Sequence, residues 1–276
     1  MSRAARADPS LTPQNSSDNV FARDKTDIEY SGSCPVPALL HGEFMSNRTL
    51  YLDGEYLARN PGWHVEESAW KAQQVLRMLR QNNVAPKTIC DVGCGVGEVL
   101  KQLQASLASE CRFWGYDVSP QAIDLAKGRA SDSIRFELAD FKQAADEFFD
   151  LILVLDVVEH LPDYFSFLQM LKARSHYKIF HIPLDLSVQT IFRKDALLKR
   201  RDMYEHLHYF TKETALRTLT DSGYEVLDSF YTPRSIDFGL SPGQMLLKLP
   251  RKLLFVLHED FAARLLGGFS LLVLAR

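Results

Sequence analysis

The stretch Thr88-Ile-Cys-Asp-Val-Gly-Cys-Gly-Val-Gly97 decides the fold of this chain. Residues 88–92 are a short and largely apolar run, which predicts a buried β-strand that carries one acid, Asp91. Three glycines at alternate positions follow, and glycine allows both a tight turn and a close approach of the backbone to a ligand. Residues 96–107 then predict a helix with one apolar face. A strand, a glycine-rich turn and a helix in this order are typical of a ligand-binding α/β unit.

Strands and helices alternate along the rest of the chain. The expected strands span residues 88–92, 112–116, 134–138, 151–155, 178–182, 225–230 and 269–275. Amphipathic segments separate most of them, so we predict an α/β fold with a doubly wound, mostly parallel, seven-stranded sheet. Residues 183–210 and 231–268 are longer than a minimal connection. Both follow strands at the carboxyl edge, where ligands bind in such sheets, and we expect them to be lid insertions that cover a substrate.

The N-terminal part differs from the α/β domain. Residues 1–45 are rich in Ser, Asp, Asn, Pro and Arg and lack periodicity, which predicts a flexible tail. Residues 46–86 are expected to form a helical cap, because apolar side chains between positions 72 and 79 recur at helical spacing. The α/β domain then occupies residues 87–276.

Composition excludes several classes of protein. The chain has 276 residues, of which 46% are hydrophobic, enough for a sizeable core. Its formal net charge of −3 argues against a nucleic-acid partner. The four cysteines lack metal-ligand spacing and the N-terminus lacks the apolar segment of a signal peptide, so we expect a reducing, cytoplasmic location. No apolar run is long enough to span a bilayer. Residues 246–257 mix basic residues with leucines, and we favour a role in the lid over a peripheral membrane contact.

Acidic residues follow the next strands as well. Asp117 ends the second strand about 20 residues beyond the glycine turn. An acid in this position can accept hydrogen bonds from both hydroxyls of a ribose. Asp140 follows the third strand, where its carboxylate can accept a hydrogen bond from the amino group of an adenine. The backbone N–H of the next residue, Phe141, can then face the adenine ring. Asp156 closes the fourth strand. Four ligand-like groups at four successive strand ends predict a nucleoside-binding edge.

A nicotinamide-dependent dehydrogenase is a weaker interpretation of the same edge. The GxGxxG pattern of dinucleotide-binding loops, begun at Gly93, requires glycine or alanine at position 98. Glu98 stands there, and its carboxylate would repel a pyrophosphate at the helix N-terminus.

On these residues the chain resembles the class I methyltransferases. Residues 91–97 are similar to their first motif and residues 156–161 to their fourth. The resemblance implies a Rossmann-like methyltransferase fold and S-adenosyl-L-methionine as cofactor. It also implies the cofactor-binding residues Asp91, Gly93, Cys94, Gly95, Asp117, Val118, Asp140, Phe141 and Asp156. The flanks at residues 53–64, 70–72 and 264–274 resemble a bacterial subgroup of small-molecule methyltransferases.

His160 is the candidate catalytic residue. It follows the fourth strand, next to the expected position of the methyl group, and a histidine can take the proton that an alcohol or phenol must lose. Three further histidines lie at or after the fifth strand and rank below it: His181, His206 and His208.

A divalent metal ion is an alternative at the same place. Asp156, Glu159 and His160 have i, i+3, i+4 spacing, so one helical turn would group two carboxylates and an imidazole. His206 or His208 would complete the site, and the ion would lower the pKa of an acceptor hydroxyl. Small-RNA 2′-O-methyltransferases and some quinone-ring O-methyltransferases look similar here. From the sequence we favour the general base and expect no metal.

The expected activity is O-methylation of a small-molecule acceptor, such as a sugar, a quinone or a polyketide-like compound. After the fourth strand the sequence has neither the Asn/Asp-Pro-Pro-aromatic run typical of base-amine methylation nor the glutamate pair of protein arginine methyltransferases. The alternatives are methylation at nitrogen or carbon, and a methyltransferase-fold partner subunit without catalysis.

Overall fold

The computed structural model describes residues 62–63, 65–144, 147–238 and 242–276. Contacts divide the chain into two units, and every described residue belongs to the second, Met45–Arg276. The expected tail at residues 1–45 and most of the flank at residues 53–64 lie outside the described residues. The expected division into tail, cap and α/β domain therefore stays a prediction.

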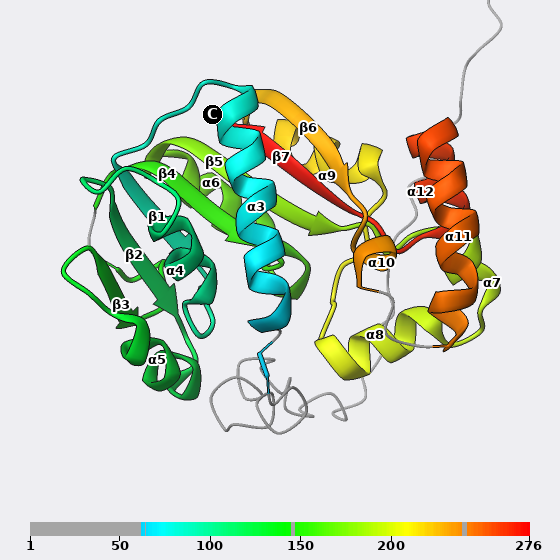
Figure 1. Ribbon diagram of the computed structural model, residues 1–276, viewed down its shortest axis with the longest axis horizontal. Helices are drawn as coiled ribbons and strands as arrows, with labels where there is room; N and C mark the ends of the chain where they lie inside the picture. Colours follow the sequence, from blue (N-terminus) through cyan, green and yellow to red (C-terminus); the bar gives the residue numbers. More distant parts are fainter. Residues whose placement is uncertain (1–61, 64, 145–146, 239–241) are drawn as a thin grey trace, which may run out of the picture. The chain divides into compact units, whose positions relative to one another are not determined.

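A seven-stranded sheet forms the centre of the second unit (Figure 1), in the order β3-β2-β1-β4-β5-β7-β6. The strands are β1 Thr88–Val92, β2 Arg112–Asp117, β3 Ile134–Leu138, β4 Phe149–Leu155, β5 Ser175–Pro183, β6 Val226–Thr232 and β7 Ser270–Ala275. All neighbouring pairs are parallel except those of β7, which runs antiparallel to β5 and β6. The expected α/β class and the mostly parallel seven-stranded sheet are confirmed.

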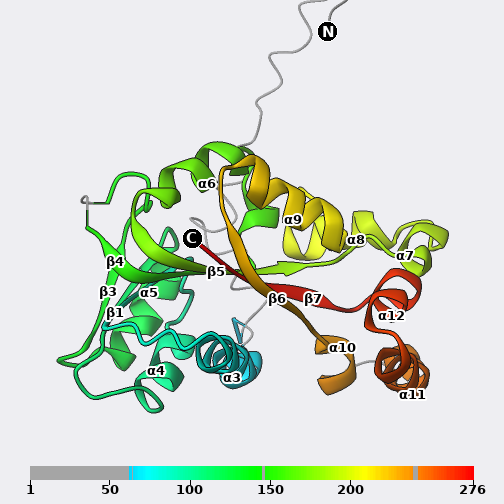
Figure 2. The ribbon, with the colours of Figure 1, turned by 90° about the horizontal axis from the view of Figure 1, so that it is seen from above.

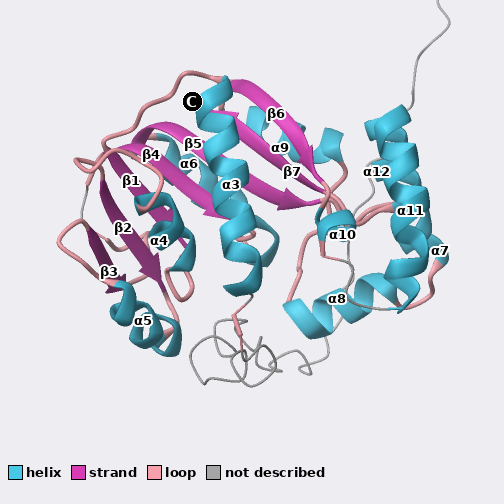
Figure 3. Cartoon of the chain, viewed as in Figure 1, coloured by secondary structure: helices cyan, strands magenta, loops and turns pink. Residues whose placement is uncertain are grey.

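Helices cover both faces of the sheet (Figures 2 and 3). On one face lie α3 Val65–Gln81 and α4 Glu98–Gln104, and on the other α6 Tyr164–Lys172 and α9 Lys212–Asp221. Side chains along β4 alternate between these two layers. Ile152 packs with α6 and α9, whereas Leu151 and Leu153 pack with α3 and α4. Because both faces of β4 are buried, residues 151–155 form one continuous apolar run.

The strand order reverses between β1 and β4. In a doubly wound sheet this is the point where the loops after the two strands separate and leave a crevice at the carboxyl edge. The turn after β1 leads into α4, and the turn after β2 leads into α5 Pro120–Ala126. Ser119 caps α5, because its hydroxyl accepts a hydrogen bond from Ala122 N at 3.3 Å.

The two long connections contain helices. Residues 183–210 form α7 Val188–Phe192 and α8 Ala196–Tyr204, and residues 231–268 form α10 Arg234–Asp237, α11 Pro242–Leu257 and α12 Glu259–Leu266. They gather at one end of the sheet in Figures 1 and 2, where α7 contacts α12. Both leave the carboxyl ends of parallel strands, as expected, and their role as a lid stays a prediction. Among the described helices, none is both long and apolar enough to cross a membrane.

Candidate functional site

The turn after β1 depends on its glycines. Gly93, Gly95 and Gly97 all have positive φ, at 79°, 54° and 77°. The amides of Gly93 and Cys94 donate to Tyr116 O at 2.8 and 3.0 Å, which ties the turn to the end of β2. A Cβ on Gly93 would lie 2.7 Å from Val157 Cγ2, closer than side chains tolerate. Glycine therefore provides both the left-handed backbone and the room for the loop that follows β4.

Asp91 presents a buried carboxylate beneath this turn. Its side chain is only 2% exposed, and Oδ1 has no hydrogen-bond partner among the described residues. Burial raises the pKa of Asp91 to about 7, with the nearby charge of Asp117 adding to the rise and Lys71 opposing it. A buried carboxylate oxygen without a partner is costly, so it suits a ligand group that donates hydrogen bonds or carries positive charge.

Asp117 lies at the end of β2, where the sequence places a ribose-binding acid. Oδ2 accepts a hydrogen bond from Gly95 N at 2.8 Å, and Oδ1 accepts one from Ser119 N at 2.9 Å. Burial raises the pKa of Asp117, although these amides favour the ionised form. Because each carboxylate oxygen has more than one acceptor position, both can bind a further donor while the amides fix the carboxylate. Val118, which is half-buried, follows directly.

The third acid is held near the second. Ala139 N donates to Asp117 O at 3.0 Å, so the chain after β3 runs alongside the end of β2. Asp140 is half-buried, and its Oδ1 accepts from Lys142 N at 3.1 Å. Phe141 is buried and makes an edge-to-face contact with Tyr116 at 5.2 Å between ring centroids. The structure thus brings Asp91, Asp117 and Asp140 to adjacent strand ends, and their contacts with a cofactor stay predictions.

Asp156 is engaged by two partners that the sequence does not reveal. Lys71 Nζ, from α3, lies 2.6 Å from Asp156 Oδ2, and His181 Nδ1, from β5, lies 2.6 Å from Oδ1. These partners hold the pKa of Asp156 well below its usual value despite burial. His181 also bonds to Thr232 Oγ1 through Nε2 at 2.9 Å, so both of its ring nitrogens are occupied. His181 therefore fits a structural role better than that of a base.

Helix α3 is fixed to the second insertion by buried polar contacts. Glu67, 2% exposed, pairs with Arg234 of α10, with Arg234 Nε 2.7 Å from Glu67 Oε2. Trp70 Nε1 donates to Asp237 Oδ2 at 2.8 Å, so Trp70 is a packing anchor. Trp63 lies at the glycine turn, with its Cε3 3.7 Å from a Cβ built on Gly95.

A second cluster begins just after Val157, the residue that contacts the glycine turn. One ligand atom from each of Glu159, His160 and His206 lies within 4.8 Å of the others. Glu159 is 1% exposed, and among the described residues neither of its carboxylate oxygens has a hydrogen-bond partner. The segment Val158–His160 is a 3-10 turn, so its geometry differs from the expected α-helical turn. Asp156 points to Lys71 and His181 instead.

Both imidazoles of this cluster are oriented through Nδ1. His160 Nδ1 lies 3.2 Å from Glu205 O, and His206 Nδ1 lies 2.5 Å from Asp185 Oδ2. A carbonyl and a carboxylate only accept, so each Nδ1 carries the proton, and the lone pair of a neutral ring sits on Nε2. Burial and the neighbouring His206 lower the pKa of His160 to about 4, so the ring is neutral at physiological pH. The prediction that His160 is a general base stands untested, and this pKa makes it a weak one.

His208 has a different role. Its Nε2 lies 2.9 Å from Leu161 O, to which it donates, and its ring contacts Tyr164 at 4.6 Å between centroids. Of the two histidines that the sequence offers to complete a metal site, the structure brings His206 to Glu159 and His160.

Backbone strain marks the same region. Among described residues other than glycine, positive φ occurs at Trp63, Asn83, Asp156 and Glu205. Trp63 is at the glycine turn, Asp156 ends β4, and Glu205 presents its carbonyl to His160. Such conformations cost about 1–2 kcal/mol for a residue with a Cβ, and they concentrate at functional sites.

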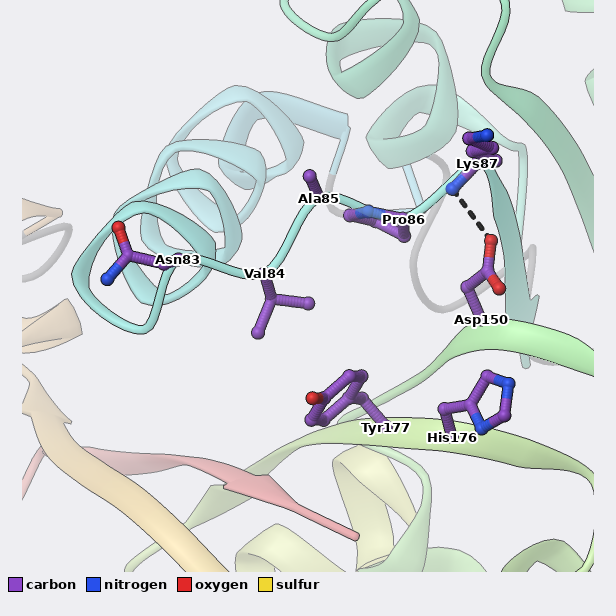
Figure 4. A pocket seen from close by; sticks show the side chains of 8 residues that line it. All are labelled: Asn83, Val84, Ala85, Pro86, Lys87, Asp150, His176 and Tyr177. Atoms are coloured by element: carbon purple, nitrogen blue, oxygen red, sulfur yellow. Dashed lines mark hydrogen bonds between the residues drawn. The ribbon is translucent and has the colours of Figure 1, made fainter.

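A pocket of about 400 Å³ lies at the opposite, amino edge of the sheet (Figure 4). Its lining comes from the loop after α3, residues 83–87, and from Asp150, His176 and Tyr177. Asp150 accepts hydrogen bonds from Lys87 N and Thr88 N, so its carboxylate fixes the start of β1. This pocket contains neither the glycine turn nor the strand-end acids, and we do not assign the site to it.

The family follows from comparison with known proteins. A family model described as a methyltransferase domain matches residues 63–229, more than half of the chain. The chain belongs to this methyltransferase family. With the observed fold, this confirms the expectation of a class I, S-adenosylmethionine-dependent methyltransferase.

Solved structures with the same fold include two methyltransferases bound to S-adenosylhomocysteine (SAH). Magnesium protoporphyrin IX methyltransferase from Synechocystis PCC 6803 aligns with a TM-score of 0.54 at 17% identity, covering 83% of this chain and 96% of that one. N-methyltransferase NodS from Bradyrhizobium japonicum WM9 aligns with a TM-score of 0.53 at 22% identity, covering 84% and 98%. At these identities the similarity shows the fold.

Two curated relatives carry different names for the acceptor atom. A ubiquinone biosynthesis O-methyltransferase of Methylobacterium sp. (strain 4-46) is 36% identical over 91 residues, which are 31% of this chain and 35% of the relative. Ajmaline N-methyltransferase of Rauvolfia serpentina is 29% identical over 91 residues, 30% and 31% of the two chains. The matches span about a third of these relatives' length. The acceptor atom is therefore a question for the site itself.

Proposed function

We propose that this methyltransferase transfers a methyl group to a hydroxyl oxygen of a small molecule bound at the carboxyl edge of β4 and β5. The observation that supports the acceptor is the cluster of buried Glu159 with half-buried His160 and His206, beside the glycine turn. The name of the O-methyltransferase relative points the same way, while the N-methyltransferase relative keeps nitrogen as the competing outcome.

The cofactor would bind along the turn after β1. The unpartnered Oδ1 of Asp91 fits the positively charged amino group of a methionine moiety, and the fixed carboxylate of Asp117 fits the two hydroxyls of a ribose. Asp140 and the backbone of Phe141 would contact the adenine. Gly93 to Gly95 would line the approach of the nucleoside, while Cys94 and Val118 would contribute packing. Lys71 and His181 would hold Asp156 at the base of the site.

The chain's contribution to the reaction would be alignment and proton handling. When bound, S-adenosylmethionine supplies a methyl group on a positively charged sulfur, and the protein must present an oxygen in line with it. An alcohol or phenol must also lose its proton. The two imidazoles donate through Nδ1 and direct Nε2 toward the carboxylate of Glu159, so they provide groups that can hold the hydroxyl and accept that proton. His160 keeps its proposed catalytic role, and Asp185 orients His206 beside it.

Paired acceptors that differ only in the receiving atom test this function. The purified chain would be incubated with methyl-labelled S-adenosylmethionine and matched phenol–aniline and alcohol–amine pairs, with the label counted in the isolated products. We expect label in the hydroxyl compounds and a loss of about 10²–10⁴-fold in His160→Ala. His176→Ala is the matched control, because His176 is exposed at the opposite edge. Transfer to amines and not to hydroxyls would refute the proposal.

A further inference from the structure

The side chain of Glu159 is a buried carboxylate whose charge no described residue compensates by a hydrogen bond. The carboxylate is 1% exposed, and neither oxygen accepts a hydrogen bond within the described part of the chain. His160 Nε2 lies 3.7 Å from Glu159 Oε1. A bound cation would compensate a carboxylate in such a place.

The two histidines are arranged as metal ligands are. Each donates its Nδ1–H to an acceptor, the carbonyl of Glu205 for His160 and the carboxylate of Asp185 for His206. This leaves both Nε2 atoms as electron-pair donors, and a carboxylate or carbonyl behind the ring fixes its tautomer and orientation. Asp185 is itself held by Arg200, with Nη1 2.5 Å from Oδ1.

Backbone hydrogen bonds also join the two segments that carry the cluster. Glu159 and His160 come from the turn after β4, whereas His206 comes from the segment after α8. Leu207 N and His208 N both donate to Glu159 O, at 2.8 and 3.1 Å, so the two segments are joined at the site itself. A site built on backbone hydrogen bonds holds its ligands in place before an ion arrives.

We propose that Glu159, His160 and His206 bind one divalent metal ion, and that this ion holds the hydroxyl oxygen of the acceptor. Two imidazole nitrogens and one carboxylate oxygen suit Zn²⁺, Mn²⁺, Fe²⁺ or Co²⁺ better than Mg²⁺ or Ca²⁺, which prefer oxygen ligands. Three protein ligands leave a coordination position for the acceptor oxygen, whose pKa the ion lowers. The role in acceptor binding rests on the proposed function, whereas the ion-binding site itself does not. With the ion bound, both Nε2 lone pairs go to the metal, and the acceptor hydroxyl, made more acidic by the ion, loses its proton to water instead of to an imidazole.

Direct metal binding to the full chain tests the site without an acceptor. Chelator-treated and dialysed protein would be titrated with Mn²⁺, with free ion followed by electron paramagnetic resonance, and with Zn²⁺ by calorimetry. We expect one ion per chain. Glu159→Gln and His206→Ala should each weaken binding at least 100-fold, and Asp185→Asn should weaken it about 10–100-fold through the orientation of His206. His176→Ala should bind as the wild type does.

Thermal unfolding provides a second readout that does not depend on activity. The ion should raise the melting temperature of the wild type and leave that of Glu159→Gln unchanged. Because Glu159→Gln removes a buried carboxylate, the metal-free variant should melt no lower than the metal-free wild type. If His206→Ala does not fold, Asp185→Asn decides the matter.

Absence of binding at millimolar ion would overturn the metal site, and so would equal binding by wild type, Glu159→Gln and Asp185→Asn. Its failure is distinguishable from failure of the proposed function. Hydroxyl methylation that continues after chelation, in protein shown to bind no ion, contradicts the metal alone. Ion binding with methyl transfer only to amines contradicts the acceptor.

Discussion

Replacing Asp117 with alanine removes the one side chain whose contacts are most fully defined at the predicted nucleoside site. In the structure its two oxygens accept hydrogen bonds from Gly95 N at 2.8 Å and Ser119 N at 2.9 Å. If the ribose hydroxyls also donate to this carboxylate, Asp117→Ala leaves two ligand donors unpaired. We expect a loss of about 1.5–3 kcal/mol in cofactor binding, which is about ten- to a hundredfold in Kd.

The same substitution should affect stability less than binding. Two backbone amides lose their acceptor, and a buried amide without a partner costs about 1–3 kcal/mol. Burial raises the pKa of Asp117, which means that folding disfavours its charged form. Removal of this buried charge therefore offsets part of the free energy lost with the two hydrogen bonds. We therefore expect a net destabilisation of about 1–2 kcal/mol. Asp117→Asn should be intermediate in both properties, because its amide oxygen still accepts one hydrogen bond.

Calorimetric titration with SAH measures the binding effect, and urea unfolding measures the stability effect. Asp124→Ala is the matched control, since Asp124 is an exposed acid on α5 whose ion pair with Lys127 faces solvent. The control should bind SAH as the wild type does. An Asp117→Ala protein that is folded and binds SAH with unchanged Kd would refute the assignment of the ribose acid.

Three further predictions concern the surroundings of this acid. Gly95→Val should abolish SAH binding in calorimetry while circular dichroism stays native, because φ is 54° and the side chain would enter the ligand's approach. Burial raises the pKa of Asp91 from 3.8 to about 7, so between these values the folded state keeps a proton that the unfolded state releases. The free energy of unfolding should therefore fall by up to about 4 kcal/mol as the pH rises from 4 to 8. Asp91→Asn should flatten that slope in urea unfolding. Lys71→Met should cost about 2–4 kcal/mol in the same assay, because Asp156 loses a largely buried partner, whereas Lys127→Met at an exposed pair should cost under about 1 kcal/mol.

The sheet was predictable because its strands carry their own signal. Five of six residues from Leu151 to Asp156 are apolar, and a parallel strand buried on both faces requires such a run. The glycine turn was predictable for a similar reason, since the three positive φ values favour glycine. Strand ends were less certain. β5 begins at Ser175, before the expected residue 178, because the polar start of the strand pairs with β4.

The contacts between distant segments could not be read from the sequence. Lys71 lies outside the apolar stripe of α3, and nothing local indicates that it reaches Asp156 at the end of β4. The pairing of Asp185 with His206 depends on how the first insertion folds back, which no motif records. The sequence did bring forward Glu159, His160 and His206, but it left His208 as an equal choice. The structure separates the two, because His208 Nε2 donates a hydrogen bond to the carbonyl of Leu161.

A crystal structure of the chain grown with SAH tests the central claim most directly. We predict that the ribose hydroxyls lie within hydrogen-bond distance of both Asp117 oxygens, with the amino group near Asp91 and the nucleoside along Gly93 to Gly95. The sulfur should then face the side of the site where Glu159, His160 and His206 meet. SAH bound elsewhere, for example in the pocket at residues 83–87, would contradict the account, as would a nucleoside at the turn that leaves Asp117 without contact.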